Sequence, residues 1–336
     1  RVNGSIKAEA GLYGGNGGQI ETSGHLLNVD NIQISTQSPL GQQGQWLLDP
    51  YNVTIGSSTT NNALVASTYT PNGANSMISA TTLSTNLNTS SITVTTTGAG
   101  SESGDINVNA AITKTGTSSR STLTLVAARD ININQKIEST GTGSWPQLNL
   151  VLTAGNNITL ANNASINTNG GNLYIGAVSG ADSVSTSGQN LVINQGSYIN
   201  GGKGLMTIKV GGSINLPDNS SQTTKYAIAS QYDTTYSYPI SNSATTAAIY
   251  NYTSKLTTIY AGTNITTANS SSTYADIYMG NDLNITARNL GSSSNPLQIT
   301  GSSDPYGLLA NPTTATGTYA NTSRSLTVNN NYGNTY

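Results

Sequence analysis

The stretch SGDINV at residues 103–108 contains the pattern that decides the fold: turn-forming residues, then an apolar, a polar and a second apolar residue. It returns as ARDINI at 128–133, GNNITL at 155–160, GGNLYI at 170–175, GQNLVI at 188–193, GGSINL at 211–216, GTNITT at 262–267 and GNDLNI at 280–285. The alternation places apolar side chains on one face of a strand and Asn or Thr on the other. Gly, Asn and Asp favour the turn before it. Each copy therefore predicts a tight turn that leads into a short β-strand.

An alternating strand also precedes several copies, as with Leu123 and Leu125 or with Met206 and Ile208. Most copies follow one another at about 15 to 28 residues, whereas turns in antiparallel sandwiches recur about every 8–12 residues. A coil of short parallel strands, with successive rungs about 4.8 Å apart, fits this spacing better. We predict an all-β parallel β-helix (β-solenoid) in which aliphatic side chains fill a narrow core and Asn and Thr stack in outward ladders.

The composition of the 336 residues agrees with a stacked coil. The chain has no Cys, no Phe, one His, 8% charged residues and a net charge of −2. A thick globular core would need more apolar residues, a charged disordered chain would need more charge, and like charges stacked at rung spacing would repel. Scattered Lys and Arg exclude a nucleic-acid partner. Because no apolar run approaches 18 residues, no segment can span a membrane as a helix, and we expect no membrane insertion.

Two stretches depart from the coil. Residues 217–256 lack the pattern, and seven Tyr residues lie within 226–260, so we predict a Tyr-rich excursion there. Residues 301–323, with two X-Pro pairs, predict a smaller excursion. Residues 57–90 have weak periodicity and predict either a surface loop or poorly matched rungs. We treat 1–336 as a single β-helical segment with these excursions.

Two blocks near the start carry a family signal. GGNGGQIETSG at residues 14–24 precedes QWLLDPYNVTI at 45–55. This pairing resembles the exoproteins of bacterial two-partner secretion, that is, the filamentous-haemagglutinin-like and high-molecular-weight-type adhesins, in which GGNGG-x-[VI]-ETSG precedes WLLDP-x-NVTI. The resemblance covers roughly residues 14–55, and the rest of the chain is similar only in its β-helical style.

The resemblance implies a right-handed β-helical shaft in a secreted or cell-surface adhesin that is exported through a dedicated outer-membrane secretion pore. A chain without Cys suits such export, since no disulfide could block the pore. The sequence opens at Arg1 without Met or a leader, so we expect an internal segment of a larger exoprotein. The residue types alone also make predictions here. Gly14 to Gly18 predict a tight corner, and Asp49-Pro50 predicts the end of a strand. Trp46 is predicted to be a packing residue.

Polysaccharide-degrading enzymes share the β-helix, so catalysis has to be weighed. Their chemistry needs clustered carboxylates, or carboxylates with a basic residue. Here the acidic residues are dispersed, and Asp105, Asp130 and Asp282 occupy turn positions, although Asp105 and Asp130 could stack on neighbouring rungs. His25 is isolated and suits a surface or turn role. We therefore predict no enzyme, no cofactor and no metal.

The Tyr-rich excursion is the best candidate for recognition, because Tyr combines a flat apolar face with a hydroxyl that can bind sugars. The candidate ligand-binding residues are Tyr226, Tyr232, Tyr236, Tyr238, Tyr250 and Tyr252. The alternative is that they pack the excursion onto the shaft. We predict an adhesin segment that binds a glycan or glycoprotein of the host cell or biofilm matrix. A purely structural shaft is the alternative function, and a polysaccharide-degrading enzyme is the third.

Overall fold

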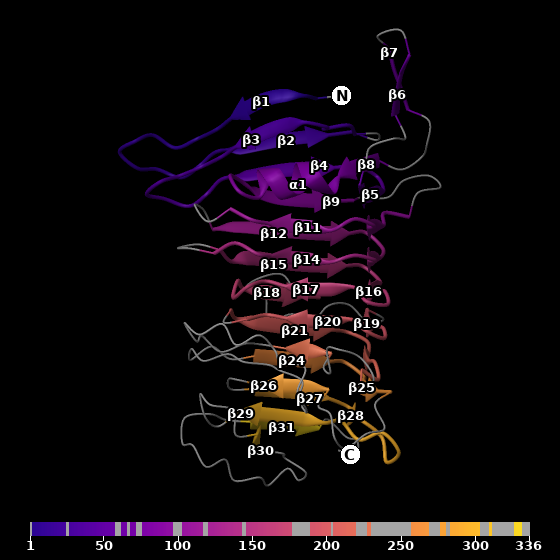
Figure 1. Cartoon of the computed structure of the whole chain (residues 1–336). Coiled ribbons are helices and arrows are strands. Elements are labelled where there is room, and N and C mark those ends of the chain that lie inside the picture. Colours follow the sequence, from indigo (N-terminus) through magenta and orange to yellow (C-terminus); the bar gives the residue numbers. More distant parts are fainter. Residues whose placement is uncertain are drawn as a thin grey trace. The chain divides into compact units, whose positions relative to one another are not determined.

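The computed structural model of the chain describes residues 2–24, 27–57, 62–65, 68–71, 76–96, 103–116, 120–142, 146–176, 189–202, 204–219, 227–229, 257–268, 276–279, 283–302, 309–310 and 326–330. The chain forms two compact units, unit 1 (Arg1–Asn156) and unit 2 (Asn157–Tyr336), which we describe separately. Figure 1 shows the strands of each unit as stacked arrows.

Unit 1 is built from parallel strands in three sheets. The first sheet has the order β2 (Gln19–Ser23), β4 (Gln45–Asp49), β9 (Ser91–Thr95), β12 (Ser121–Ala127) and β15 (Leu148–Ala154). The second has the order β8 (Ser76–Ser79), β5 (Val53–Gly56), β10 (Ile106–Val108) and β13 (Ile131–Ile133). The third pairs β11 (Ile112–Lys114) with β14 (Ile137–Ser139). From β9 to β15 the chain visits the three sheets in turn, which is the path of a parallel β-helix.

Unit 2 repeats this arrangement. Its first sheet has the order β18 (Leu173–Ile175), β21 (Met206–Val210), β24 (Thr257–Ala261), β27 (Leu283–Ala287) and β31 (Leu326–Asn330). Its second has the order β16 (Asn157–Leu160), β19 (Asn190–Ile193), β22 (Ile214–Leu216), β25 (Asn264–Thr267) and β28 (Asn289–Leu290). Its third has the order β17 (Ser165–Asn167), β20 (Tyr198–Asn200), β23 (Ile228–Ala229), β26 (Ile277–Met279) and β29 (Ile299–Ser302). All these pairings are parallel, so the predicted β-solenoid is confirmed.

The repeated sequence pattern forms the core as predicted. In β10, Ile106 and Val108 are completely buried, and Asn107 between them points outward. Their register partners in β13 are Ile131 and Ile133, which are also completely buried. Aliphatic residues thus stack on aliphatic residues from rung to rung, and each contributes about 1.5–3 kcal/mol by burial. The narrow core consists of these single side chains, which explains why so little apolar composition suffices.

Residues 57–90, for which the sequence left two alternatives, contain two elements of other kinds. Strands β6 (Asn62–Val65) and β7 (Thr68–Pro71) form an antiparallel hairpin. The helix α1 (Ala80–Asn86) follows β8, and the Ser79 side chain accepts a hydrogen bond from the Thr82 N–H at its start. No helix was expected here. Neither α1 nor any other described segment forms a helix of membrane-spanning length and hydrophobicity.

Helix α1 links two sheets by side-chain hydrogen bonds. A separate parallel pair, β1 (Gly4–Lys7) with β3 (Ile32–Ser35), supplies one edge, where Asn86 Oδ1 accepts from Ile34 N at 2.6 Å and Asn86 Nδ2 donates to Ile32 O at 3.0 Å. On β11, the Thr113 N–H donates to Ser84 Oγ at 3.0 Å. The helix therefore covers two strand edges that would otherwise expose backbone groups.

The predicted excursions contain short strands. Within residues 217–256, β23 pairs with β20 and β26, so the chain rejoins the coil there. Asn219 is buried, accepts from Gly196 N at 2.8 Å and donates to Ser197 O at 3.0 Å. Within residues 301–323, β30 (Leu309–Ala310) pairs antiparallel with β29. Residues 220–226, 230–256, 303–308 and 311–323 of the two excursions lie outside the described residues.

Candidate functional site

The six tyrosines predicted to bind ligand all lie outside the described residues, as do His25 and Asp282. The tyrosine prediction therefore stays a prediction. On the outer face of the first sheet of unit 2, Tyr174 on β18 and Tyr260 on β24 are half-buried, and Tyr198 on β20 of the third sheet is half-buried too. In register, Tyr174 stands beside Thr207 and Tyr260 beside Lys209. Neither was among the candidate residues: Tyr174 lies inside a regular copy of the repeat, and Tyr260, although counted among the seven tyrosines of 226–260, lies in the strand before the copy at 262–267.

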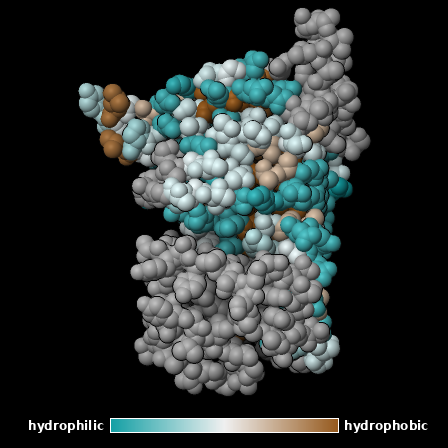
Figure 2. All heavy atoms as spheres, in the orientation of Figure 1, coloured by the Kyte–Doolittle hydropathy of each residue, from teal (hydrophilic) through white to brown (hydrophobic). Residues whose placement is uncertain are grey.

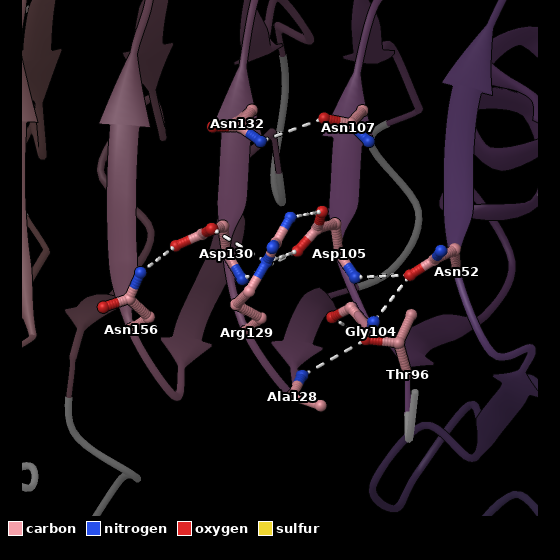
Figure 3. Close-up of polar contacts among 10 residues, drawn as sticks. All are labelled: Asn52, Thr96, Gly104, Asp105, Asn107, Ala128, Arg129, Asp130, Asn132 and Asn156. Carbon is pink, nitrogen blue, oxygen red and sulfur yellow. Dashed lines mark hydrogen bonds and ion pairs between the residues drawn. The ribbon is translucent and has the colours of Figure 1, made fainter. Parts of the chain in front are cut away.

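Four polar residues at turns of unit 1 form a hydrogen-bonded row, which we call the corner ladder: Asn52, Asp105, Asp130 and Asn156 (Figure 3). Asn52 Oδ1 accepts from the N–H groups of Gly104 (2.6 Å) and Asp105 (2.8 Å). Asp105 Oδ1 accepts from Asp130 N at 3.3 Å, and Asn156 Nδ2 donates to Asp130 Oδ1 at 2.8 Å. Asn52 and Asp105 thus bind backbone N–H groups in the turn of the next rung, and Asp130 binds the side chain of Asn156.

Arg129 neutralises the two carboxylates of this row. Its Nε donates to Asp105 Oδ1 at 2.7 Å and its Nη2 to Asp105 Oδ2 at 2.5 Å, while Nε lies 3.1 Å from Asp130 Oδ2 (Figure 3). The hydrogen bonds to Asp105 raise the pKa of Arg129. Asp105 and Asp130 do stack, as the sequence allowed, and their oxygens bind turn groups and a guanidinium. Asp105, Asp130 and Arg129 therefore form an ion-pair network between neighbouring rungs.

A second set of ladders runs along the outer faces of the strands. Asn132 Nδ2 donates to Asn107 Oδ1 at 3.0 Å, and Asn134 Nδ2 donates to Asn109 Oδ1 at 2.7 Å. In unit 2, the same pairing joins Asn190 to Asn157 at 2.9 Å and Asn289 to Asn264 at 2.8 Å, and Thr266 to Asn215 at 2.9 Å. The predicted outward ladders of Asn and Thr are therefore confirmed.

The residues of the two family blocks have clear structural roles. Trp46 is completely buried, and its Nε1 donates to Thr22 Oγ1 at 3.0 Å, so it is the predicted packing residue. Strand β4 ends at Asp49, as the Asp-Pro pair predicted. Gly14 and Gly15 have φ angles of +117° and +104°, which an L side chain rarely adopts, and this accounts for two of the glycines at the predicted corner.

Asp49 and Glu21 are a pair of described carboxylates that bears on the enzymatic alternative. Burial, and then the negative charge of Glu21, raise the pKa of the Asp49 carboxyl. Its Oδ1 is buried without a hydrogen-bond partner, and Glu21 accepts from Ser23 Oγ at 2.7 Å. Across the described ranges, no group of three or more His, Cys, Asp or Glu residues is arranged to hold a metal ion.

One buried amine escaped sequence reasoning. Lys114, the last residue of β11, is completely buried, and its Nζ donates to Gly116 O at 2.8 Å. Burial lowers the pKa of Lys114 to about 8. The alternation itself contains the signal, because Lys114 lies two residues after the inward Ile112 and so faces the same side.

Comparison with known proteins adds no relative to this picture. No protein-family model matches the chain, and no curated protein matches it.

Proposed function

We propose that the chain is part of a secreted bacterial adhesin that attaches cells to host tissue or biofilm matrix by binding glycans. The observation that carries this proposal is the outer surface of the sheets, where rows of uncharged amides and hydroxyls repeat at the spacing of the rungs. In unit 1 one such row is Thr54, Asn107 and Asn132. Amide and hydroxyl groups are suitable partners for sugar hydroxyls, and a rigid sheet holds them at fixed separations.

In unit 2, outward tyrosines support the same proposal of glycan binding. Tyr174 and Tyr260 are described on an outer face, and the six predicted tyrosines belong to the same part of the sequence. Aromatic faces stack on the apolar faces of sugar rings, while the phenol hydroxyl forms hydrogen bonds. The resemblance of residues 14–55 to two-partner-secretion exoproteins supports export through an outer-membrane pore and a location at the cell surface or in the medium.

The experiment is a glycan array probed with the whole chain and a variant in which Tyr232, Tyr236 and Tyr238 are replaced by Ala. We expect the wild type to bind a defined set of glycans and the triple variant to lose most of that signal while keeping its β-sheet circular dichroism. Tyr51→Ala, far from these residues in the sequence, is the matched control and should bind as the wild type does. Equal binding by the triple variant would refute the role of these tyrosines.

A purely structural shaft is the second candidate, and the ladders favour it. The Asn107–Asn132 and Asn109–Asn134 bonds engage amides with one another and stiffen the coil rather than leaving them all for ligand. A chain that resists denaturation yet binds neither glycans nor cells would establish this function in place of adhesion.

A further inference from the structure

Three large apolar side chains are strongly exposed in the described part of the chain, and they lie on two neighbouring loops. Leu12 is 86% exposed, Tyr13 is fully exposed and Leu40 is 74% exposed. The loops are residues 8–18, between β1 and β2, and residues 36–44, between β3 and β4. We call them the tip loops. Figure 2 shows hydrophobic residues gathered on a projection at the upper left of the view.

The tip loops are held together by hydrogen bonds. Ala10 N donates to Gln37 O and Gly17 N to Gln42 O, both at 2.9 Å. Gln42 N donates to Asn16 Oδ1 at 2.9 Å. A Cβ atom at Gly17 would overlap the Thr36 carbonyl oxygen, and one at Gly41 would overlap the Gly15 carbonyl oxygen. The glycines of the GGNGG block therefore let the two loops stack backbone on backbone.

Local turns present the apolar side chains. Gly14 N donates to Gly11 O at 3.2 Å, which closes a turn with Leu12 and Tyr13 at its apex. On the second loop, Gly41 N donates to Ser38 Oγ at 2.8 Å, and Leu40 lies between these two residues. Ser38 Oγ in turn donates to Gly15 O at 2.6 Å. Several polar groups of the projection are thus bonded within it, and Leu12, Tyr13 and Leu40 are directed to solvent.

The outer part of the tip loops, beyond Glu9, carries no charge. Residues 10–20 and 36–48 contain no Asp, Glu, Lys or Arg. At its base, Lys7 Nζ lies 3.8 Å from Glu9 Oε1, so the nearest opposite charges are paired. Moving the tip out of water therefore requires no charge to be desolvated, which is the largest cost of entering an apolar phase.

We propose that the tip loops dock on the surface of a phospholipid bilayer, with Leu12, Tyr13 and Leu40 entering its interfacial region. A specific protein interface takes about 20–30 residues from each side, and three side chains on a convex tip are far fewer. A fluid bilayer closes around a convex tip without a preformed pocket. Tyr suits the lipid–water interface, Leu suits the hydrocarbon edge, and internally bonded backbone groups lower the cost of entry.

Because the chain has no Cys, one introduced cysteine labels one site. We would attach the environment-sensitive fluorophore NBD to Leu12→Cys and add vesicles of pure phosphatidylcholine. NBD emission should rise several-fold and shift to shorter wavelength. The matched control is Gln135→Cys, at an exposed turn between β13 and β14, whose emission should not change. Replacing part of the lipid by phosphatidylserine, or adding salt, should leave the signal nearly unchanged, because residues 10–20 and 36–48 carry no charge and Glu9 at the base is paired with Lys7.

A second measurement uses unlabelled protein. Vesicle flotation of a double variant, Leu12→Ser with Leu40→Ser, should show partitioning reduced by about tenfold or more, since two apolar contacts are lost. Gln135→Ser should float as the wild type does. The exposed positions keep the fold intact, which circular dichroism checks.

Three results would overturn the proposal: no change in NBD emission at position 12, an equal change at position 135, or wild-type flotation of the double variant. An NBD signal that rises with protein concentration in the absence of lipid would show instead that the tip pairs with a second copy. Glycan binding is measured without lipid. A chain that binds glycans but not vesicles would therefore refute the membrane proposal and leave the proposed glycan binding intact.

Discussion

The guanidinium of Arg129 binds the Asp105 carboxylate of the neighbouring rung through two hydrogen bonds, of 2.7 and 2.5 Å. Asp105 and Asp130 occupy equivalent places on adjacent rungs, one residue before register-paired Ile106 and Ile131. Like charges at this separation repel, so the structure tolerates the stacked pair because Arg129 lies between them.

Replacing Arg129 with Ala should lower the midpoint of denaturant unfolding, because the two carboxylates then face each other without a counter-charge. The loss should shrink at high salt, since exposed charges are screened. In the Arg129→Ala background, Asp105→Asn should recover part of the stability by removing one of the like charges. If the double variant were less stable than Arg129→Ala, repulsion between the carboxylates would not be the cause.

Lys114 makes stability depend on pH in the alkaline range. Burial lowers its pKa to about 8 in the folded chain, against about 10.4 in an unfolded chain. The unfolded state therefore binds more protons between these values, so the free energy of unfolding should rise as pH rises from about 8 to about 10, by up to about 3 kcal/mol. Below pH 8 the full penalty of the buried charge remains.

The variant Lys114→Met isolates this effect. It keeps a long side chain in the core and should remove the alkaline rise seen in chemical denaturation at pH 7, 8, 9 and 10. The surface variant Lys136→Met is the control, and it should leave the rise in place. A Lys114→Met chain with an unchanged pH profile would exclude Lys114 as its origin.

Substitution of Ile131 tests whether the apolar positions of the repeated pattern form the core. Ile131→Ala should destabilise by about 2–5 kcal/mol, because a completely buried side chain is truncated between stacked rungs. Asn132→Thr, on the outer face of the same strand, should cost less than 1 kcal/mol, since it removes a partly exposed amide pair. Denaturation midpoints measure both. Similar losses at both positions would contradict the inward and outward assignment.

Asn86 should be indispensable to α1. Asn86→Leu would leave Ile34 N and Ile32 O of β3 without their side-chain partner, at a cost of about 2–4 kcal/mol for two buried groups. Leu is a better helix former than Asn, so a loss of stability could not come from helix propensity. Thr85→Ala, on the exposed side of the helix, should be neutral or slightly stabilising. A stable Asn86→Leu chain would show that these hydrogen bonds are unimportant.

The sequence predicted those parts of the fold that repeat. Ile106, Asn107 and Val108 alternate strictly, and the same alternation in later copies determined both the core and the ladders. Trp46 is likewise predicted as a packing residue, and it is completely buried. These signals are local, and the coil is the arrangement in which local alternation and rung spacing agree.

Helix α1 could not be predicted in this way. Ala80–Asn86 is rich in Thr, Ser and Asn, which are poor helix formers. Its helical form depends on tertiary bonds that Asn86 and Ser84 make with strands remote in the sequence. The tip loops were missed for a related reason, because glycine-flanked Leu12 and Tyr13 look like an ordinary turn until the second loop is placed beside them.

Because equivalent residues of neighbouring rungs pair with one another, the coil can change its length by whole rungs during evolution. Ile106 pairs with Ile131, Asn107 with Asn132 and Val108 with Ile133, so one rung can follow another with the same inward and outward residues. Tandem duplication or deletion of a whole rung would preserve every such stack, whereas an insertion of one residue within a strand would reverse which of the following side chains face inward. The length of the coil is therefore free to change by whole rungs while its cross-section stays constant.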